Sequence, residues 1–383
     1  MSAADDAPEA AYVARIAEAG LAAFCRAVLA GAGADLESAD AATRAMLHAS
    51  RHGIDSHGVR LLDHYVRALV GGRVNGTPTL AFDRSDRPVA MLDADHAHGA
   101  RATYAAMARA GAAARRFGIG AVAIRNSSHF GAAGAYALAA AEEGLVGVAV
   151  CNSDSFVRLH GGAERFHGTN PIAAAAPCGE GRPWLLDMAT SAIPYNRIVL
   201  HRSLERPLPD GVASTEDGGD TRDPNLAAML APLGGAFGYK GAGLAGLVEI
   251  LSALLTGMGT SAELLPMTGP DFETHRGLGA FVLAIDPDAF VGRAEFEAGM
   301  RRYLAALRGS LPAHGARVLA PGDREWAQAE ARARTGIPVD PHSLEAFRRL
   351  AEAWDVPFPA IAPEEGDTGS NARAVSHQRE EPR

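Results

Sequence analysis

The segment RHGIDSHGVRLLDHY (residues 51–65) gathers side chains that could bind and polarise an acid. Ser56 can cap a helix, and His57 and Arg60 would then lie in its first turns, because residues three or four apart share a helix face. Free amides at a helix N-terminus attract anions, and an arginine can hold a carboxylate through two hydrogen bonds. The segment indicates an anion-binding pocket, although a capped surface helix with solvated charges is, taken alone, the simpler explanation.

A second segment, NSSHFGAAG (residues 126–134), places His129 directly after a predicted strand and at the start of the following predicted helix. Junctions of this kind often carry site residues in α/β folds. The pKa of a histidine, near 6.5, suits proton transfer at neutral pH, and the glycines that follow let a flat ligand approach the backbone. His129 is therefore a candidate proton donor, beside the more common alternative of a structural histidine.

Two carboxylates also follow predicted strands. Asp154, in CNSD (residues 151–154), could orient a histidine or accept a hydrogen bond from a substrate. Asp187, in LLDMATS (residues 185–191), precedes small and hydroxyl residues that could bind phosphate or ribose. An ordinary exit from a strand into a loop explains each position as well, and HGTNP (residues 167–171) could be a tight turn and nothing more.

Several common functional motifs are missing or lack their context. GAGLAG (residues 241–246) satisfies G-x-G-x-x-G, but loop-type residues precede it where a Rossmann fingerprint needs a strand, so we expect a glycine-rich helix. HAH (residues 96–98) offers two histidines without H-E-x-x-H or a nearby carboxylate cluster, and no metal is predicted. G-x-S-x-G does not occur, so nothing supports a serine hydrolase.

The composition of the 383 residues limits the class of protein. The formal net charge is −9 with both signs interspersed, so a nucleic-acid partner is not expected. Cys25, Cys151 and Cys178 are widely spaced, which disfavours a disulfide framework and fits a reducing cytoplasm. The acidic N-terminus lacks the apolar stretch of a signal peptide, and no run of about 18 apolar residues predicts a membrane span.

Hydrophobic spacing predicts a helical N-terminal part followed by an α/β middle. We expect three helices between residues 12 and 72. The first includes Val13 and Ile16 and is stopped by Gly31, the second has Ser38 as its N-cap, and the third covers residues 56–69. Strands are expected at 89–95, 120–126, 145–151, 172–177, 183–189 and 280–287, and further helices at 100–118, 131–144, 240–255, 293–308 and 342–354.

Two polar segments are expected to lie outside the main fold. Residues 203–224 are rich in turn formers, which predicts an exposed excursion. Residues 364–383 are charged and almost without bulky apolar side chains, so we expect a disordered tail.

Taken together, the sequence resembles the malate/L-lactate dehydrogenase family of the second type. This non-Rossmann group includes ureidoglycolate, sulfolactate and diketogulonate enzymes and the piperideine-2-carboxylate reductases. The matching segments occur in family order between about residues 12 and 360. They are RHGIDSHGVRLLDHY, RNSSHFGAAGAYA, CNSD, HGTNPIAAAAP, LLDMATS, PLGGAFGYKGAGLAGLVEILSALLTG and APGDREW.

The resemblance implies an α/β (α+β) fold, with a non-Rossmann dinucleotide-binding domain built on a mixed, largely antiparallel sheet. This domain would cover residues 81–289, and a helical domain would combine residues 1–80 with residues 290–360. The resemblance also implies a homodimer with its site near the subunit interface. The reaction would be hydride transfer between NAD or NADP and C2 of a 2-hydroxy/2-oxo acid or a cyclic 2-imino acid.

The resemblance implies roles for single residues. His129 matches the family histidine assigned to proton transfer, and His57 matches a second histidine that takes the donor role in some members. Asp154 matches a carboxylate of the catalytic site. Substrate contact is implied for Ser56, Arg60, Tyr65 and Asp187, and cofactor contact for His129, Gly131, Thr169, Asn170, Asp187, Met188, Ala189, Lys240, Gly322 and Glu325.

Some positions depart from the pattern of many members. Ser153 stands where many have a lysine, and Leu61 where many have an arginine, whose nearest counterpart here is Arg60. Both positions bear on the identity of the substrate. SAIPYNR (residues 191–197) differs near the expected path of the cofactor, so NAD and NADP both stay open. The alternative function is that of a family member without catalysis, which binds a nucleotide or an acid.

Overall fold

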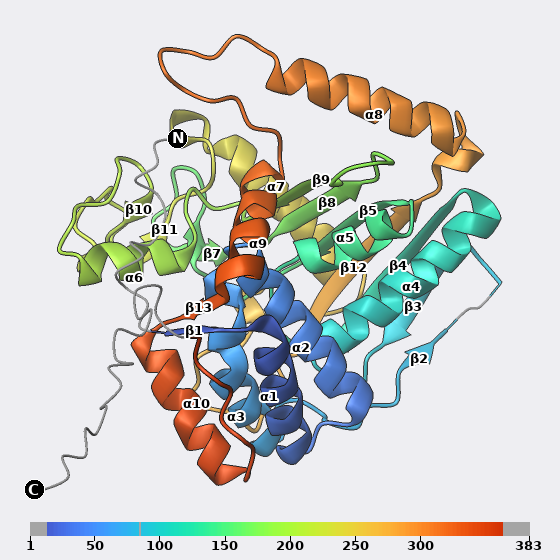
Figure 1. Ribbon diagram of the computed structural model, residues 1–383. Coiled ribbons are helices and arrows are strands. Elements are labelled where there is room, and N and C mark those ends of the chain that lie inside the picture. Colours follow the sequence, from blue (N-terminus) through green and yellow to red (C-terminus); the bar gives the residue numbers. More distant parts are fainter. Residues whose placement is uncertain (1–13, 84–85, 363–383) are drawn as a thin grey trace, which may run out of the picture.

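The computed structural model describes residues 14–83 and 86–362, which form a seven-stranded sheet of order β2-β3-β4-β12-β5-β8-β9 (Figure 1). Its strands are β2 (Ala81–Phe82), β3 (Val89–Asp93), β4 (Ile119–Ser127), β5 (Val146–Cys151), β8 (Ile172–Ala176), β9 (Trp184–Met188) and β12 (Leu278–Ile285). Here β3 and β4 run parallel, and the other described neighbours run antiparallel. The expected α/β fold with a mixed, largely antiparallel sheet is confirmed.

The central strand of this sheet comes from a late part of the sequence. β12 lies between β4 and β5 and pairs antiparallel with both. At the beginning of β12, Leu278 pairs with Ser127 at the end of β4, and Ala280 pairs with Cys151 at the end of β5. The ends of β4 and β5 and the beginning of β12 therefore meet at one end of the sheet.

Helices cover both faces of the sheet. α4 and α5 lie on one face, and the end of α7 with a π-helical turn lies on the other (Figure 1). The bounds are α4 (Gly99–Phe117), α5 (Gly134–Glu142), α7 (Tyr239–Glu249) and the π-helix Ile250–Leu254. The layers approach closely, because a Cβ atom on Gly279 of β12 would overlap the carbonyl oxygen of Ser252. GAGLAG lies inside α7, which confirms a helix in place of a Rossmann turn.

A helical layer joins the two ends of the described chain. It contains α1 (Glu18–Gly31), α2 (Leu36–Arg51), α3 (Leu62–Val70) and α10 (Pro341–Ala353), which share one apolar core. Beside them, β1 (Ala14–Ile16) pairs antiparallel with β13 (Ile337–Val339). Phe24 of α1 meets Phe347 of α10 with ring centroids 5.4 Å apart. Segments far apart in the sequence therefore complete one core.

Two further helices, α8 and α9, lie between β12 and β13 in the sequence. α9 (Asp323–Thr335) leads into β13, and no helix was predicted there, because few of its side chains are apolar and buried. α8 (Arg293–Arg308) lies apart from the helical layer (Figure 1). Its Leu304 packs with Cys178 and Ala320 instead.

The segment expected to be an exposed excursion, residues 203–224, belongs to a second sheet. This sheet has the order β10-β11-β6-β7, with β10 (Ala213–Ser214), β11 (Met229–Leu230), β6 (Val157–Arg158) and β7 (Arg165–His167). Leu208 and Ala213 of the segment share a small core with Ile198 of α6 (Tyr195–Ser203). Most other side chains between residues 204 and 223 are exposed, as an excursion predicts, whereas these apolar residues between the turn formers anchor the segment to the second sheet.

The predicted starts of the first two helices are wrong for local reasons. α1 begins at Glu18 because residues 14–16 pair as β1. α2 begins earlier than predicted, with Asp35 as its N-cap: the Asp35 carboxylate accepts a hydrogen bond from the Ser38 amide at 2.7 Å. Ser38 therefore lies inside the helix that it was expected to cap.

The other departures concern segments near the expected site. Ser56 caps no helix, because Asp55–His57 and Val59–Leu61 form 3-10 turns before α3 begins. α5 begins at Gly134, so His129 lies in the turn between β4 and α5. Short 3-10 turns also occur at Gly235–Phe237, Ser261–Glu263 and Pro287–Ala289. The predicted tail, residues 364–383, lies outside the described residues, and no described helix is long and apolar enough to cross a membrane.

Asp35→Ala should destabilise the protein, because it removes the acceptor that caps α2. The expected loss in the free energy of unfolding is about 0.5–2 kcal/mol. Ser38→Ala is the matched control, since the buried Ser38 hydroxyl has no hydrogen-bond partner among the described residues; it should change that free energy by less than about 0.5 kcal/mol. Urea denaturation followed by circular dichroism measures both, and a larger loss in Ser38→Ala would contradict the assignment.

Candidate active site

One end of the sheet carries side chains that could do chemistry. His129 follows the end of β4, Asp154 follows the end of β5, and Arg276 precedes the beginning of β12. Because β12 runs antiparallel to both neighbours, these three positions share one end of the sheet. The topology therefore places a histidine, a carboxylate and a guanidinium from distant segments in one region.

His57 and His129 lie beside each other in this region. Their ring centroids are 5.8 Å apart, and the ring planes are stacked at 22°. Ser56 Oγ lies 2.8 Å from His57 Nδ1, and Tyr65 Oη lies 2.9 Å from His129 Nδ1. Each ring is thus held at Nδ1 by a hydroxyl, which leaves its Nε2 for a substrate.

Burial dominates the electrostatics of this pair. Burial lowers the pKa of His57 from 6.5 to about 4. The pKa of His129 is lowered well below 6.5, first by burial and then by electrostatic repulsion between its protonated form and the ionisable groups of His57, His64 and Arg276. Burial also raises the pKa of Tyr65. At neutral pH, both imidazoles are therefore uncharged and the Tyr65 phenol keeps its proton.

Asp154 and Arg276 form a buried ion pair, with side chains that are 10% and 3% exposed. One oxygen of Asp154 accepts from Arg276 Nη2, and the other accepts from the Met267 amide at 3.2 Å. Arg276 Nε donates to the carbonyl oxygen of Leu265 at 2.9 Å. Asp154 was expected to orient a histidine or accept from a substrate, and in the structure it orients an arginine. Sequence reasoning missed Arg276 because no motif surrounds it.

Arg73, at the end of the α3 segment, holds the loop that carries Arg276. Arg73 is 3% exposed, and its Nη1 donates to the carbonyl oxygens of Pro266 at 3.2 Å and Met267 at 3.1 Å. Its Nη2 donates to the carbonyl oxygen of Asp271. The loop is thereby tied to the helical layer at several points, which keeps Arg276 in place before any substrate binds.

Arg60 is not brought to this cluster. Its side chain is exposed and acts electrostatically on Asp340, the N-cap of α10. The spacing of Ser56, His57 and Arg60 places them on one face only in an α-helix, whereas this segment forms two 3-10 turns. The predicted carboxylate binder therefore lies elsewhere, and Arg276 is the arginine next to the histidines.

Segments expected to contact the cofactor lie on the β8–β9 side of the region. Asp187, in β9, accepts a hydrogen bond from the Gly134 amide at the start of α5 at 2.8 Å. Just after β9, the Thr190 amide donates to the carbonyl oxygen of Thr169 at 2.9 Å. The half-buried residues between these two contacts are Met188 and Ala189. Hydrogen bonds thus join the end of β9 both to the start of α5 and to the segment around Thr169.

Gly131 lies buried beside the histidine pair. Its φ is 79°, a left-handed conformation that favours glycine. A Cβ atom added there would lie 3.8 Å from both the His57 carbonyl oxygen and Tyr65 Oη. A larger residue would therefore be strained here and would fill the space next to these two oxygen atoms.

The remaining predicted cofactor residues lie farther along the same side. Gly322, the N-cap of α9, lies against the backbone of Leu185 in β9, and the charge of Glu325 acts on Asp187. Lys240 lies in the first turn of α7 with an exposed side chain, and its Nζ is 5.4 Å from the centroid of the Phe237 ring.

The side-chain amide of Asn170 is fully hydrogen-bonded within the protein. Its Nδ2 donates to Glu249 Oε1 at 2.8 Å and to the Ala245 carbonyl oxygen at 3.3 Å. Its Oδ1 accepts from the Ser153 amide and the Ser261 hydroxyl, each at 3.2 Å. These contacts satisfy both donors and the acceptor of the amide, so a cofactor could contact Asn170 only through its backbone. Glu249, at the centre of this network, was not predicted from the sequence.

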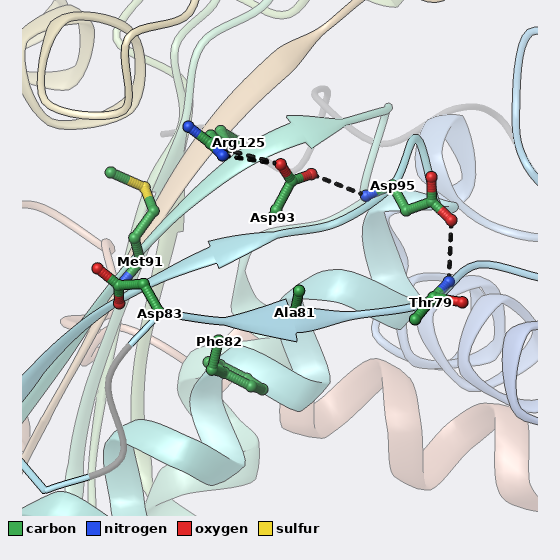
Figure 2. Close-up of a pocket in the computed structure, with 8 residues that line it drawn as sticks. All are labelled: Thr79, Ala81, Phe82, Asp83, Met91, Asp93, Asp95 and Arg125. Atoms are coloured by element: carbon green, nitrogen blue, oxygen red, sulfur yellow. Dashed lines mark hydrogen bonds and ion pairs between the residues drawn. The ribbon is translucent and has the colours of Figure 1, made fainter.

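A surface groove of about 440 Å³ lies away from these residues, along β2 and β3 (Figure 2). Asp93 pairs with Arg125 there at 2.9 Å, and Asp95 accepts from the Thr79 amide at 2.9 Å. The predicted site residues do not line the groove, and we assign no function to it. The described residues contain no group of three or more His, Cys, Asp or Glu side chains that could hold a metal ion.

Known proteins share this architecture. Residues 16–348 match the family described as malate/L-lactate dehydrogenase. A malate dehydrogenase of Pyrococcus abyssi is 36% identical over 88% of this chain and 94% of that protein. An L-sulfolactate dehydrogenase of Methanocaldococcus jannaschii is 31% identical over 82% of this chain and 90% of that protein. A Delta(1)-pyrroline-2-carboxylate/Delta(1)-piperideine-2-carboxylate reductase of Pseudomonas putida is 34% identical over 81% of this chain and 90% of that protein.

A solved structure agrees with these relatives. The malate dehydrogenase of Pyrococcus horikoshii OT3 superposes with a TM-score of 0.82 at 32% identity, covering 91% of this chain and 97% of that one. The fold and the relatives define the class, which is that of the NAD(P)-dependent oxidoreductases outside the Rossmann group. Within this class, the chain belongs to the malate/L-lactate dehydrogenase family.

Asp187→Asn should stabilise the cofactor-free protein at neutral pH. Burial, and to a smaller extent Glu325, raises the pKa of Asp187 from 3.8 to about 6 against the effect of the Gly134 hydrogen bond. Because the folded-state pKa lies above the unfolded one, the stability that this group contributes is present below about pH 4 and is lost as the pH rises through about 6. The asparagine does not titrate and can still accept from Gly134.

The difference in the free energy of unfolding between the variant and the wild type should therefore grow by about 1–3 kcal/mol from about pH 4 to about pH 8. Urea denaturation at both pH values measures it. Asp210→Asn, at an exposed position, is the control and should show no such growth. An unchanged pH dependence in Asp187→Asn would contradict the raised pKa.

Proposed function

We propose that the protein transfers a hydride between NAD or NADP and C2 of a small 2-hydroxy/2-oxo acid or cyclic 2-imino acid. The observation that carries the proposal is the uncharged His57–His129 pair next to the Asp154–Arg276 ion pair. The reaction needs a proton carrier and a carboxylate binder close together. The relatives support it, because their names give malate, sulfolactate and cyclic imino carboxylates as substrates.

The residues beside the histidines fit a nicotinamide dinucleotide. The glycine at position 131 keeps a side chain out of the space beside the His57 carbonyl oxygen and the Tyr65 hydroxyl, space that a Cβ atom would fill. The cofactor would be held by Gly131, the backbone of Thr169 and Asn170, Asp187, Met188, Ala189, Lys240, Gly322 and Glu325. When bound, the cofactor supplies the hydride.

His129 is the proposed proton carrier. Its contact with Tyr65 Oη at Nδ1 fixes the ring. In the tautomer with the proton on Nδ1, the ring donates this hydrogen bond and Nε2 can exchange a proton with the heteroatom on C2. In the oxidation direction, the neutral Nε2 takes the hydroxyl proton as the hydride leaves C2. In the reduction direction, the protonated ring returns that proton. His57, held by Ser56, orients the substrate next to it.

Arg276 is the proposed binder of the substrate carboxylate. Its Nη2 and Nε are held by Asp154 and Leu265, and among the described residues no hydrogen bond takes up its Nη1. A charged hydrogen bond to a carboxylate is about twice as strong as a neutral one, and the fixed guanidinium loses little freedom when it binds. Asp154 is therefore a positioning residue for Arg276.

The pH dependence of the two reaction directions should differ. Because the pKa of His129 lies well below 6.5, the neutral base predominates at neutral pH, and kcat/KM for oxidation should be constant from about pH 7 to about pH 9. Reduction needs the protonated ring, so its kcat/KM should fall about tenfold per pH unit over the same range. Initial rates at 340 nm measure both. A pH-independent reduction would show that another group gives the proton.

His129→Ala should lower kcat by about 10²–10⁴-fold, because it removes the proton carrier. Binding of NADH, measured by its fluorescence, should change little. His314→Ala, at an exposed position outside the site, is the control and should keep full activity. Full activity in His129→Ala would contradict the assignment. If NADH and NADPH bind but neither is oxidised with 2-oxo acids or cyclic imino acids, the alternative of a non-catalytic binding protein is favoured.

We also infer that two copies of the chain associate through α7 and the π-helix. This element exposes apolar side chains along one face, with Leu244, Leu247, Ile250 and Leu254 between 38% and 62% exposed. A continuous apolar face of this kind usually marks an interface. Lys240 lies on the same element, so a partner subunit here would stand close to the cofactor residues.

Leu247→Asp combined with Leu254→Asp should convert the dimer to a monomer, because it places two charges in the inferred interface. Light scattering coupled to size-exclusion chromatography measures the mass. Leu311→Asp is the matched control, since Leu311 is 96% exposed and lies outside α7. A mass that stays dimeric in the double variant would place the interface elsewhere.

We further infer a cytoplasmic location. Cys25, Cys151 and Cys178 are free and buried. Cysteines that stay unpaired are typical of proteins in reducing compartments.

A further inference from the structure

We propose that the substrate of this site carries one negative charge, its 2-carboxylate, and an uncharged remainder. The inference rests on the proposed function and narrows its substrate class. Malate and sulfolactate, which name two relatives, each have a second anionic group, whereas pyrroline-2-carboxylate and piperideine-2-carboxylate have none. The charges around the histidine pair favour the second kind of acid.

The groups that act on His129 supply one permanent positive charge. They are Arg276 and the rings of His57, His64 and His98. Burial lowers the pKa of His57 to about 4 and, with smaller effects of neighbouring charges, that of His64 to about 4 and that of His98 to about 3. These rings are uncharged at neutral pH. Among the described residues, Arg276 is the cation that remains at this pair.

Asp154 already offsets the charge of Arg276. The two side chains are in direct contact and almost fully buried. The protein therefore presents close to zero net charge to the substrate, with a guanidinium that can still accept one carboxylate. A second anionic group would find no further charge to pair with.

Other cationic side chains of the region are engaged elsewhere. The guanidinium of Arg73 is taken up by the carbonyl oxygens of the loop before Arg276. Arg60 is exposed and acts on Asp340. Lys240 is exposed beside the Phe237 ring. None of these described contacts leads to the histidine pair.

Ser153 and Leu61, the sequence neighbours of Asp154 and Arg60, carry no charge. Ser153 precedes Asp154, and its hydroxyl accepts a hydrogen bond from the Thr169 amide at 3.1 Å. Leu61 is half-buried and packs against the apolar core of the helical layer. Neither side chain can pair with an anion.

A second carboxylate would thus be buried without a partner. The surroundings that keep the histidines uncharged disfavour every charge, including one on the substrate. An unpaired buried charge costs far more than a neutral polar group that can form hydrogen bonds. An acid with an uncharged remainder avoids this cost and keeps its contact with Arg276.

The test compares oxaloacetate with 2-oxosuccinamate, in which an amide of similar size replaces the 4-carboxylate. With the wild-type protein and saturating NADH or NADPH, kcat/KM should be at least about tenfold higher for the amide. Equal or higher kcat/KM for oxaloacetate overturns the inference, and is the result that a second cation from a partner subunit would produce.

Ser153→Lys places a cation next to Asp154. It should shift the ratio of the two kcat/KM values toward oxaloacetate by at least about tenfold. Ser153→Met, with a long uncharged side chain, is the matched control and should keep the wild-type preference. Because the ratio is taken within each protein, the loss of the hydrogen bond to Thr169 cancels. An unchanged ratio in Ser153→Lys overturns the charge explanation.

The failure of the proposed function gives a different result. In that case, neither acid and no cyclic imino acid would oxidise NADH or NADPH, although the fluorescence of the reduced cofactor shows that it binds. That outcome overturns the proposed function and the inference with it. A preference for oxaloacetate overturns the inference alone.

Discussion

The insertion of β12 between β4 and β5 is the constraint on which the site depends. The antiparallel pairing on both sides aligns the beginning of β12 with the ends of its neighbours. His129, Asp154 and Arg276 leave the sheet at this one end. Since a register slip of one residue turns every side chain to the opposite face, the pairing that builds the core also sets the positions of these three groups.

Burial gives this arrangement its chemical character. The histidines are packed where charge is disfavoured, and hydroxyl groups hold the Nδ1 atoms of His57 and His129. The same burial makes the contact between Asp154 and Arg276 necessary, because either charge alone would be costly in this place. A neutral proton carrier and a fixed cation therefore follow from one physical condition, the burial of these groups at the end of the sheet.

The sequence predicted those site residues whose positions depend on local structure. His129, Asp154 and Asp187 each lie at or just after the end of a strand that its apolar run makes recognisable. Arg276 could not be found in this way, because its place depends on the pairing of β12 with strands far away in the sequence. Arg60 was placed in the pocket by a spacing argument that holds for an α-helix, and the chain forms 3-10 turns there instead.

The fold itself was predicted in the same uneven manner. The long strands of the main sheet and the helices that cover it were predicted from the sequence with errors of a few residues at their ends. The second sheet was missed, because strands of two or three residues have no periodicity that a sequence pattern could reveal. α9 was missed because its buried face is small, with Ala329 and Arg332 as its buried residues.

The pairing of β1 with β13 sets an order of events during synthesis. Ile16 and Phe24 emerge from the ribosome long before Ile337 and Phe347, the side chains that cover them. Contacts between segments so far apart form late in folding. The first helices therefore keep an uncovered apolar surface while the whole sheet is translated. This surface is the part of the nascent chain that a chaperone would have to cover.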